Sequence, residues 1–172
     1  MTSSMVVFRC TRKLLQRVEH TAGHESELAS STTRLGDWYA NVVSVRRQHV
    51  VLGVSGVTLL PVLVAAAPYK TMIPRFDEAA GQVLRALNVD EARIAAEQEG
   101  MQDFVVAKTN DRRVLGSMND FVNMLEAYLS DQSLLGAALK LAESPCSPIG
   151  MKSPREATLA LFSAPALRLV RS

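Results

Sequence analysis

Residues 50–67 read VVLGVSGVTLLPVLVAAA, a run of eighteen positions without a charged side chain. This length just reaches that of a transmembrane helix, and Arg46 and Arg47 would supply an orientation signal. However, Ser55-Gly56 interrupts the run with a pair suited to a tight turn with positive φ. Pro61 would break the second half of a helix, and the frequent valines favour a pleated sheet. We therefore predict a β-hairpin, with a membrane span and a buried helix as the alternatives.

The segments around this hairpin predict a larger sheet. Trp38 to Val45 alternates like a strand and leads through Arg46-Arg47-Gln48-His49 into the hairpin, which gives a three-stranded antiparallel meander. Trp38 is expected to anchor the core. The remaining predicted strands are Met5 to Cys10, Phe104 to Ala107 and Leu134 to Leu141.

Helix start and stop signals predict about five helices. Pro74 opens a helix whose apolar residues recur at helical spacing, and Asn88 ends it. Ser117 and Asp120 have the spacing of a capping box, which predicts a helix start at Ser117. The other predicted helices follow Thr11, run from Asp90 to about Gly100, and run from a capping box at Ser153-Pro154-Arg155-Glu156 to about Phe162.

Composition places the chain among ordinary globular proteins. It has 172 residues, 48% hydrophobic and 21% charged, which suits one domain with a proper core. We predict an α+β fold, an antiparallel sheet built on the three-stranded meander and packed against about five helices. Residues 5–162 form the predicted domain, residues 1–4 a disordered extension and residues 163–172 a loosely ordered tail.

The net charge, the cysteine count and the first residues of the chain indicate where the protein is located and what it binds. A net charge of +2 is too small to indicate a nucleic-acid binder by itself. Two cysteines, Cys10 and Cys146, do not make a disulfide scaffold, so a reduced cytosolic state is expected. The first residues lack the basic and apolar regions of a signal peptide. We therefore expect a cytoplasmic protein.

The segment KTNDRRVLGSMNDF, Lys108 to Phe121, contains the strongest candidate for a binding site. Three cationic side chains precede the predicted helix start at Ser117, where backbone N–H groups and the helix dipole attract anions. The alternative is a turn with solvated charges, in which Asp120 already occupies the helix N-terminus. The candidate residues for binding an anion or a partner are Lys108, Asn110, Arg112, Arg113, Ser117, Asn119 and Asp120.

Two weaker patterns involve metal-ligating or nucleophilic residues. Glu19, His20, His24 and Glu25 include two histidines four positions apart, but Gly23 makes a continuous helix doubtful and no CxxC motif supports a metal site. Cys146 lies between two prolines, and nothing in the sequence brings a histidine base to it. We interpret it as a structural cysteine, and we predict no metal site.

Three segments resemble an uncharacterised bacterial family, domain of unknown function 6933. They are TRLGDWYAN at 33–41, KTNDRRVLGSMNDF at 108–121 and SPCSPI at 144–149, of which VLGSMNDF is the most specific. The resemblance covers Met5 to Phe162 and implies a small prokaryotic cytosolic protein without known catalytic residues. It also weakens the membrane interpretation, because relatives carry polar and charged residues where this chain has Ser55-Gly56-Val57. This unusually apolar hairpin is a candidate oligomer or partner surface.

The sequence favours a non-enzymatic binding or regulatory protein that contacts an anionic group or a protein partner through the basic turn. No carboxylate pair, catalytic triad or metal cluster stands out, so we expect no catalytic residue and no cofactor. The alternative is an enzyme acting on a phosphorylated or nucleic-acid substrate through Lys108, Arg113, Asn119 and Asp120. A pocket joining these groups to a buried acid or base would favour the enzyme, and a flat exposed patch the binding module. A homo-oligomer is compatible with either, and no membrane association is expected.

Overall fold

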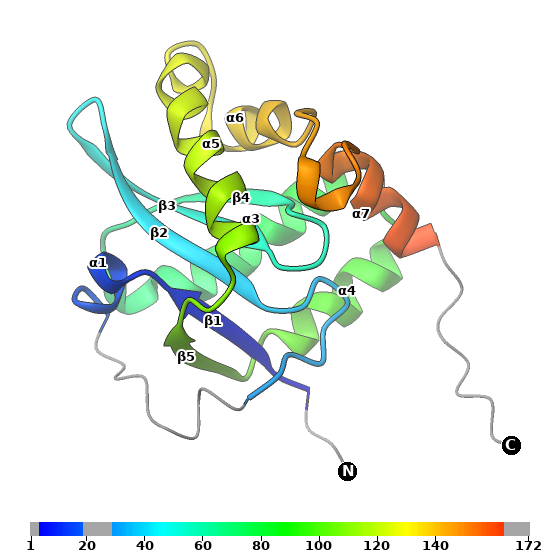
Figure 1. Cartoon of the computed structure of the whole chain (residues 1–172). Helices are drawn as coiled ribbons and strands as arrows, with labels where there is room; N and C mark the ends of the chain where they lie inside the picture. The colour runs from blue at the N-terminus through cyan, green and yellow to red at the C-terminus, as the bar shows by residue number, and fades with distance from the viewer. Residues whose placement is uncertain (1–3, 19–28, 164–172) are drawn as a thin grey trace, which may run out of the picture.

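The computed structural model describes residues 4–18 and 29–163 and has an α+β fold (Figure 1). Its five-stranded sheet has the order β4-β3-β2-β1-β5. The strands are β1 (Val6–Cys10), β2 (Trp38–Val45), β3 (Gln48–Ser55), β4 (Pro61–Ala65) and β5 (Phe104–Lys108).

The predicted meander is confirmed. β2 pairs antiparallel with β3, and β3 pairs antiparallel with β4. The turn between β2 and β3 consists of Arg46 and Arg47, both at positive φ, as a two-residue hairpin turn requires. The hairpin of β3 and β4 differs in detail from the prediction, because Gly56–Leu60 forms a longer connection in which Leu59, at φ 62, has the left-handed conformation.

Buried hydroxyls hold this longer connection. The Ser55 hydroxyl donates to the Leu35 carbonyl at 2.7 Å and accepts from the amides of Val57 and Thr58, each at 3.1 Å. The Ser55 side chain thus gives hydrogen-bond partners to backbone amides of the connection that have no partner in the sheet. This stabilises a connection longer than a two-residue turn.

The rest of the sheet is parallel, and the sheet as a whole is therefore mixed. β1 lies between β2 and β5 and is parallel to both. The prediction of an antiparallel sheet holds for the meander only. β4 and β5 are the two edge strands, and the chain between them crosses from one edge of the sheet to the other through two helices.

The starts of the helices agree with the predictions within two residues, as at Met72 where Pro74 was expected, except in the segment 134–141 and in the helix that contains Ser117. Leu134–Leu141 is a helix, so its assignment as a strand is wrong. The Ser133 hydroxyl accepts the Gly136 amide at 3.0 Å as an N-cap, and Ala137, Ala138 and Leu141 form a buried helical face. The helices are α1 (Arg12–Leu15), α3 (Met72–Ala86), α4 (Glu91–Gly100), α5 (Arg112–Leu129), α6 (Leu134–Leu141) and α7 (Pro154–Ser163), with 3-10 turns η1 (Tyr69–Thr71) and η2 (Ser147–Ile149).

The predicted helix end at Asn88 and the predicted helix start at Ser153 are both confirmed. Asn88 follows α3 at φ 64, in the left-handed conformation that ends a helix. Ser153 accepts the Glu156 amide at 3.1 Å and so caps α7.

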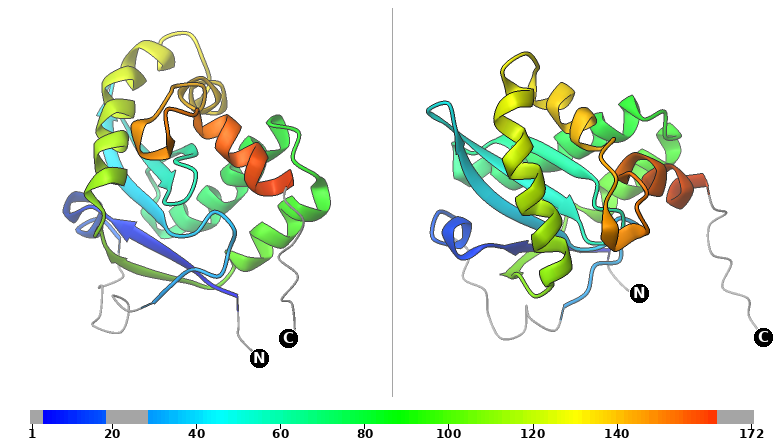
Figure 2. Two further views of the ribbon diagram at one scale, coloured as in Figure 1. Left: turned by 45° about the vertical axis from the view of Figure 1, so that its right-hand side comes forward. Right: turned by 45° about the horizontal axis from the view of Figure 1, so that its top comes forward.

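The sheet is covered on both faces by helices of the same chain. α3 and α5 lie on opposite faces, and α6 packs along the edge strand β4 (Figure 2). β3 and β4 are therefore buried by the chain itself, which accounts for their apolar sequence without a membrane or a partner. No helix in the described ranges combines the length and apolarity needed to cross a membrane.

The core on the α3 face is organised around Phe76. Its ring meets the rings of Phe8 and Trp38 edge to face, at centroid distances of 5.3 and 5.1 Å. The Phe76 ring lies directly against Gly53 of β3, where an added Cβ would overlap Phe76 Cζ. Trp38 is fully buried, as its predicted role requires.

Candidate functional site

The carboxyl ends of β1 and β5 meet at one edge of the sheet. Cys10, the last residue of β1, pairs with Lys108, the last residue of β5. α1 begins two residues after Cys10, and α5 begins four residues after Lys108. Ligands of open parallel sheets usually bind outside such strand ends. We call the five exposed cations of these segments the basic edge: Arg12, Lys13, Lys108, Arg112 and Arg113.

A buried ion pair lies beneath the basic edge. Arg9, only 5% exposed, donates from Nε to the Asp37 carboxylate at 2.6 Å and from Nη1 to the Lys108 carbonyl at 3.2 Å. The second carboxylate oxygen of Asp37 accepts the Ser31 hydroxyl at 2.7 Å. Arg9 therefore joins β1 to the end of β5 and to the segment before β2, and its charge is paired, as a buried charge requires.

Tyr39 fixes the loop that carries Asn110. The Tyr39 hydroxyl donates to Asn110 Oδ1 at 2.5 Å. Burial raises the pKa of Tyr39, and the nearby carboxylates of Asp111 and Asp37 raise it further against the opposing effect of Arg9. The hydroxyl thus stays protonated at neutral pH and keeps its role as the donor.

α5 begins at Arg112, and the prediction of a helix start at Ser117 is wrong. The Asp111 carboxylate accepts the amides of Arg113 and Val114, at 2.9 and 3.4 Å, and is the N-cap. Asp111 is a strong cap followed by good helix formers, so the helix starts before Gly116 and continues through it. Ser117 lies inside the helix and is buried.

The seven candidate residues therefore divide into two groups. Lys108, Asn110, Arg112 and Arg113 lie together at the carboxyl ends of the strands and the start of α5. Ser117, Asn119 and Asp120 belong to the middle of α5, with Asn119 about 10 Å from Arg112 along the axis. The helix N-terminus is already occupied by Asp111, so an anion would be held at the basic edge by side chains.

Arg113 and Asp120 also have structural neighbours. Arg113 Nη2 donates to the Pro148 carbonyl at 3.0 Å and ties α5 to the η2 turn. Burial raises the pKa of Cys146, as does the negative charge of Asp120. A buried thiol with a raised pKa is a poor nucleophile, which agrees with the structural role expected for Cys146.

Residues 7–157 match the family described as Domain of unknown function (DUF6933). The chain belongs to this family. No curated protein and no solved structure gives a significant match. The DUF6933 match extends from β1 into α7 and includes every residue of the basic edge. The family description names no activity, so the function has to be argued from the residues.

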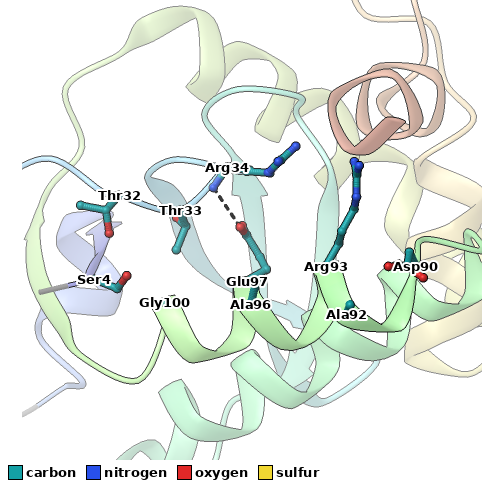
Figure 3. A pocket seen from close by; sticks show the side chains of 10 residues that line it. All are labelled: Ser4, Thr32, Thr33, Arg34, Asp90, Ala92, Arg93, Ala96, Glu97 and Gly100. Carbon is teal, nitrogen blue, oxygen red and sulfur yellow. Dashed lines mark hydrogen bonds between the residues drawn. The ribbon is translucent and has the colours of Figure 1, made fainter. Parts of the chain in front are cut away.

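The DUF6933 fold also contains a pocket that the sequence did not reveal. This pocket, of about 390 Å³, lies between α4 and the segment before β2 (Figure 3). Glu97, only 4% exposed, accepts the amides of Arg34 and Leu35 at 2.9 and 3.0 Å and holds this segment against α4. Arg34 Nη1 in turn donates to the Leu161 carbonyl near the end of α7, at 3.2 Å. These contacts give Glu97 and Arg34 a structural role in the pocket wall.

One sequence feature could have indicated Glu97. It follows the buried Ile94 by three positions and so lies on the inward face of α4, where an ionisable residue is unusual. Among the described residues, no group of three or more His, Cys, Asp or Glu side chains is arranged to hold a metal. The histidines considered as ligands, His20 and His24, lie outside the described residues.

Proposed function

We propose that this protein is a cytoplasmic, non-enzymatic binding or regulatory module whose basic edge contacts an anionic partner. The observation that carries the proposal is the pairing of Cys10 with Lys108, because it brings cations from two distant segments of the chain to one edge of the sheet. Arg12 and Lys13 precede Lys108 by about a hundred positions in the sequence. A cluster of exposed cations attracts anionic groups more strongly than a net charge of +2 suggests.

The form of the site supports a binding module over the enzyme alternative. Five pockets on the described part of the molecule contain none of the seven candidate residues in their walls. The half-buried Asp37, beside the basic edge, is already bonded to Arg9 and Ser31. A general base needs a free position beside a bound substrate, whereas a flat cationic surface is sufficient for contact with a partner.

Fluorescence anisotropy with the whole chain tests this proposal. The probes are a labelled polyglutamate peptide and a labelled single-stranded oligonucleotide. The variant K108E/R112E reverses two charges of the basic edge and leaves Arg113, which supports the η2 turn, in place. The control K140E/R155E makes the same change in net charge at an exposed lysine and an exposed arginine outside the basic edge.

We expect K108E/R112E to weaken binding of at least one probe by about tenfold, or about 1.4 kcal/mol. The control should bind within about twofold of the wild type. If the oligonucleotide is the better probe, the slope of log K against log salt should fall by about 0.7 for each phosphate that the variant no longer neutralises. Equal losses of affinity in the two variants would attribute binding to net charge alone and contradict the proposal.

A further inference from the structure

A groove beside the start of α3 has the features of a small-molecule site. One pocket, of about 180 Å³, is lined by Ile73, Pro74, Asp77, Met101, Gln102 and Phe104. A neighbouring pocket, of about 120 Å³, shares Ile73, Pro74 and Phe104 and adds Arg17, Val18, Tyr69 and Lys70. The two pockets share three lining residues and therefore adjoin, and we call them together the α3 groove.

The acidic end of the α3 groove contains a carboxylate with an unused acceptor. Asp77 is only 9% exposed. Its Oδ2 accepts from Gln102 Nε2 at 3.0 Å, while its Oδ1 is buried and has no hydrogen-bond partner among the described residues. A buried carboxylate oxygen without a donor is unfavourable and uncommon in folded proteins. It is the kind of group that a ligand donor satisfies.

The electrostatic surroundings of Asp77 favour a cationic donor. Burial raises the pKa of Asp77 to about 6, with further contributions from the negative charges of Glu78 and Glu97. The carboxylate is still mostly ionised at pH 7. A positive group beside it would relieve both the repulsion from the two glutamates and the loss of hydration.

The other end of the α3 groove has the opposite charge. Arg17 and Lys70 are exposed and line this end. The walls between the two ends are mainly apolar, with Ile73 buried and Phe104 half-buried. Lys70 precedes Asp77 by seven positions in η1 and α3, so the two ends are separated by about 10 Å along the helix.

We propose that the α3 groove binds a small organic zwitterion, with an ammonium group at Asp77, an aliphatic body against Ile73 and Phe104, and a carboxylate near Arg17 and Lys70. This is the charge pattern of a long-chain ω-amino acid. Gln102 positions the Asp77 carboxylate through its amide. A metal ion fits less well, because Asp77 is the one carboxylate in the walls of the two pockets.

This site shares no residue with the basic edge, so the two proposals stand or fall separately. The probes are 8-aminooctanoate, octylamine and octanoate, titrated into the whole chain by calorimetry. The variant D77N keeps the shape of the side chain and removes its charge. D103N is the matched control, because Asp103 is exposed and adjoins Phe104 without lining either pocket.

We expect 8-aminooctanoate to bind most tightly, and D77N to weaken its binding by about tenfold. D77N should weaken the binding of octylamine to a similar extent and leave the binding of octanoate unchanged, whereas D103N should bind all three probes as the wild type does. K70A should weaken the binding of 8-aminooctanoate and of octanoate but not that of octylamine. Wild-type affinity of D77N for 8-aminooctanoate would overturn the proposal.

An NMR titration of the unmodified chain keeps the test independent of any variant. The proposal predicts that 8-aminooctanoate shifts the side-chain amide signals of Gln102 and the backbone signals of residues 69–77. No shift in these signals at millimolar concentration would also overturn it.

Discussion

The two halves of the sheet are stabilised in different ways. The meander side, where β3 and β4 pack against α3, depends on shape: Gly53 leaves room for the Phe76 ring, and almost every side chain is apolar. The parallel side, where β1 and β5 end, depends on paired polar groups, namely Arg9 with Asp37 and Tyr39 with Asn110. The first arrangement is compatible with a closed core, and the second leaves charged groups at the surface for contact with a partner.

The largest expected effect of a single substitution is on the polar side. Asp37→Ala leaves the buried Arg9 guanidinium without its carboxylate. Breaking one member of such a pair should lower the free energy of unfolding by about 3 kcal/mol, as measured by urea denaturation. The double variant R9M/D37A should be more stable than D37A, because it removes the unpaired charge. A D37A protein as stable as the wild type would show that the ion pair does not stabilise the parallel side of the sheet.

On the meander side, Gly53→Ala tests the shape argument. The new methyl group would overlap the Phe76 ring at the centre of the core, and overpacking of this kind should cost about 2 kcal/mol in urea denaturation. Gly116→Ala is the control, since a Cβ there meets no atom within 4 Å in the middle of α5. It should stabilise the protein by up to about 1 kcal/mol. Equal effects of the two alanines would contradict the close approach of Phe76.

Asp77 is the buried acidic residue of α3, the helix that covers the meander. Its pKa of about 6 in the folded protein lies above its ordinary value, because of burial and of Glu78 and Glu97. The folded state therefore binds this proton more tightly than the unfolded state does. The contribution of the bound proton to the free energy of unfolding is fully present below the pKa that Asp77 has in the unfolded chain. It is lost as the pH rises through about 6, the pKa in the folded protein.

Asp77→Asn should thus raise the free energy of unfolding by about 1 to 2 kcal/mol at pH 7 and have little effect near pH 4. Urea denaturation from pH 4 to pH 8 measures this difference. Glu97, whose pKa is also raised by burial, titrates in both proteins, so the difference between the two profiles reports Asp77 together with its repulsion of Glu97. An unchanged pH profile in D77N would contradict the account of this carboxylate.

The smallest expected effect concerns the bond between Tyr39 and Asn110. Tyr39→Phe removes only the hydroxyl that donates to Asn110. The protein should become less stable by about 1 kcal/mol in urea denaturation, with a selective increase in hydrogen exchange at residues 109–112. Equal changes in exchange at the hairpin residues 50–65 would show that this hydrogen bond supports the whole sheet and not the parallel side alone.

The meander could be predicted from the sequence because its determinants are local. The apolar run, its interruption at Ser55-Gly56 and the preceding alternation from Trp38 all concern neighbours along the chain. The strand assigned to Leu134–Leu141 was wrong for a related reason. A short apolar run fits a buried strand or a buried helix equally well, and the N-cap at Ser133 decided between them.

The site was harder to predict because its contacts connect distant residues. Lys108, Asn110, Arg112 and Arg113 were recognised from their local charge pattern. The contributions of Arg12 and Lys13 depend on the pairing of β1 with β5, which no local pattern contains. The capping-box spacing of Ser117 and Asp120 predicts a helix start at Ser117, whereas the N-cap that α5 uses is the Asp111 carboxylate, six positions earlier in the chain.

The most direct test of the basic edge is an NMR titration of the whole chain with the polyglutamate peptide. The account predicts that chemical-shift changes are concentrated at residues 10–13 and 108–113, with the meander residues 50–65 unaffected. Shifts confined to the meander, or none at peptide concentrations that saturate the anisotropy signal, would contradict the assignment of the binding surface to this edge.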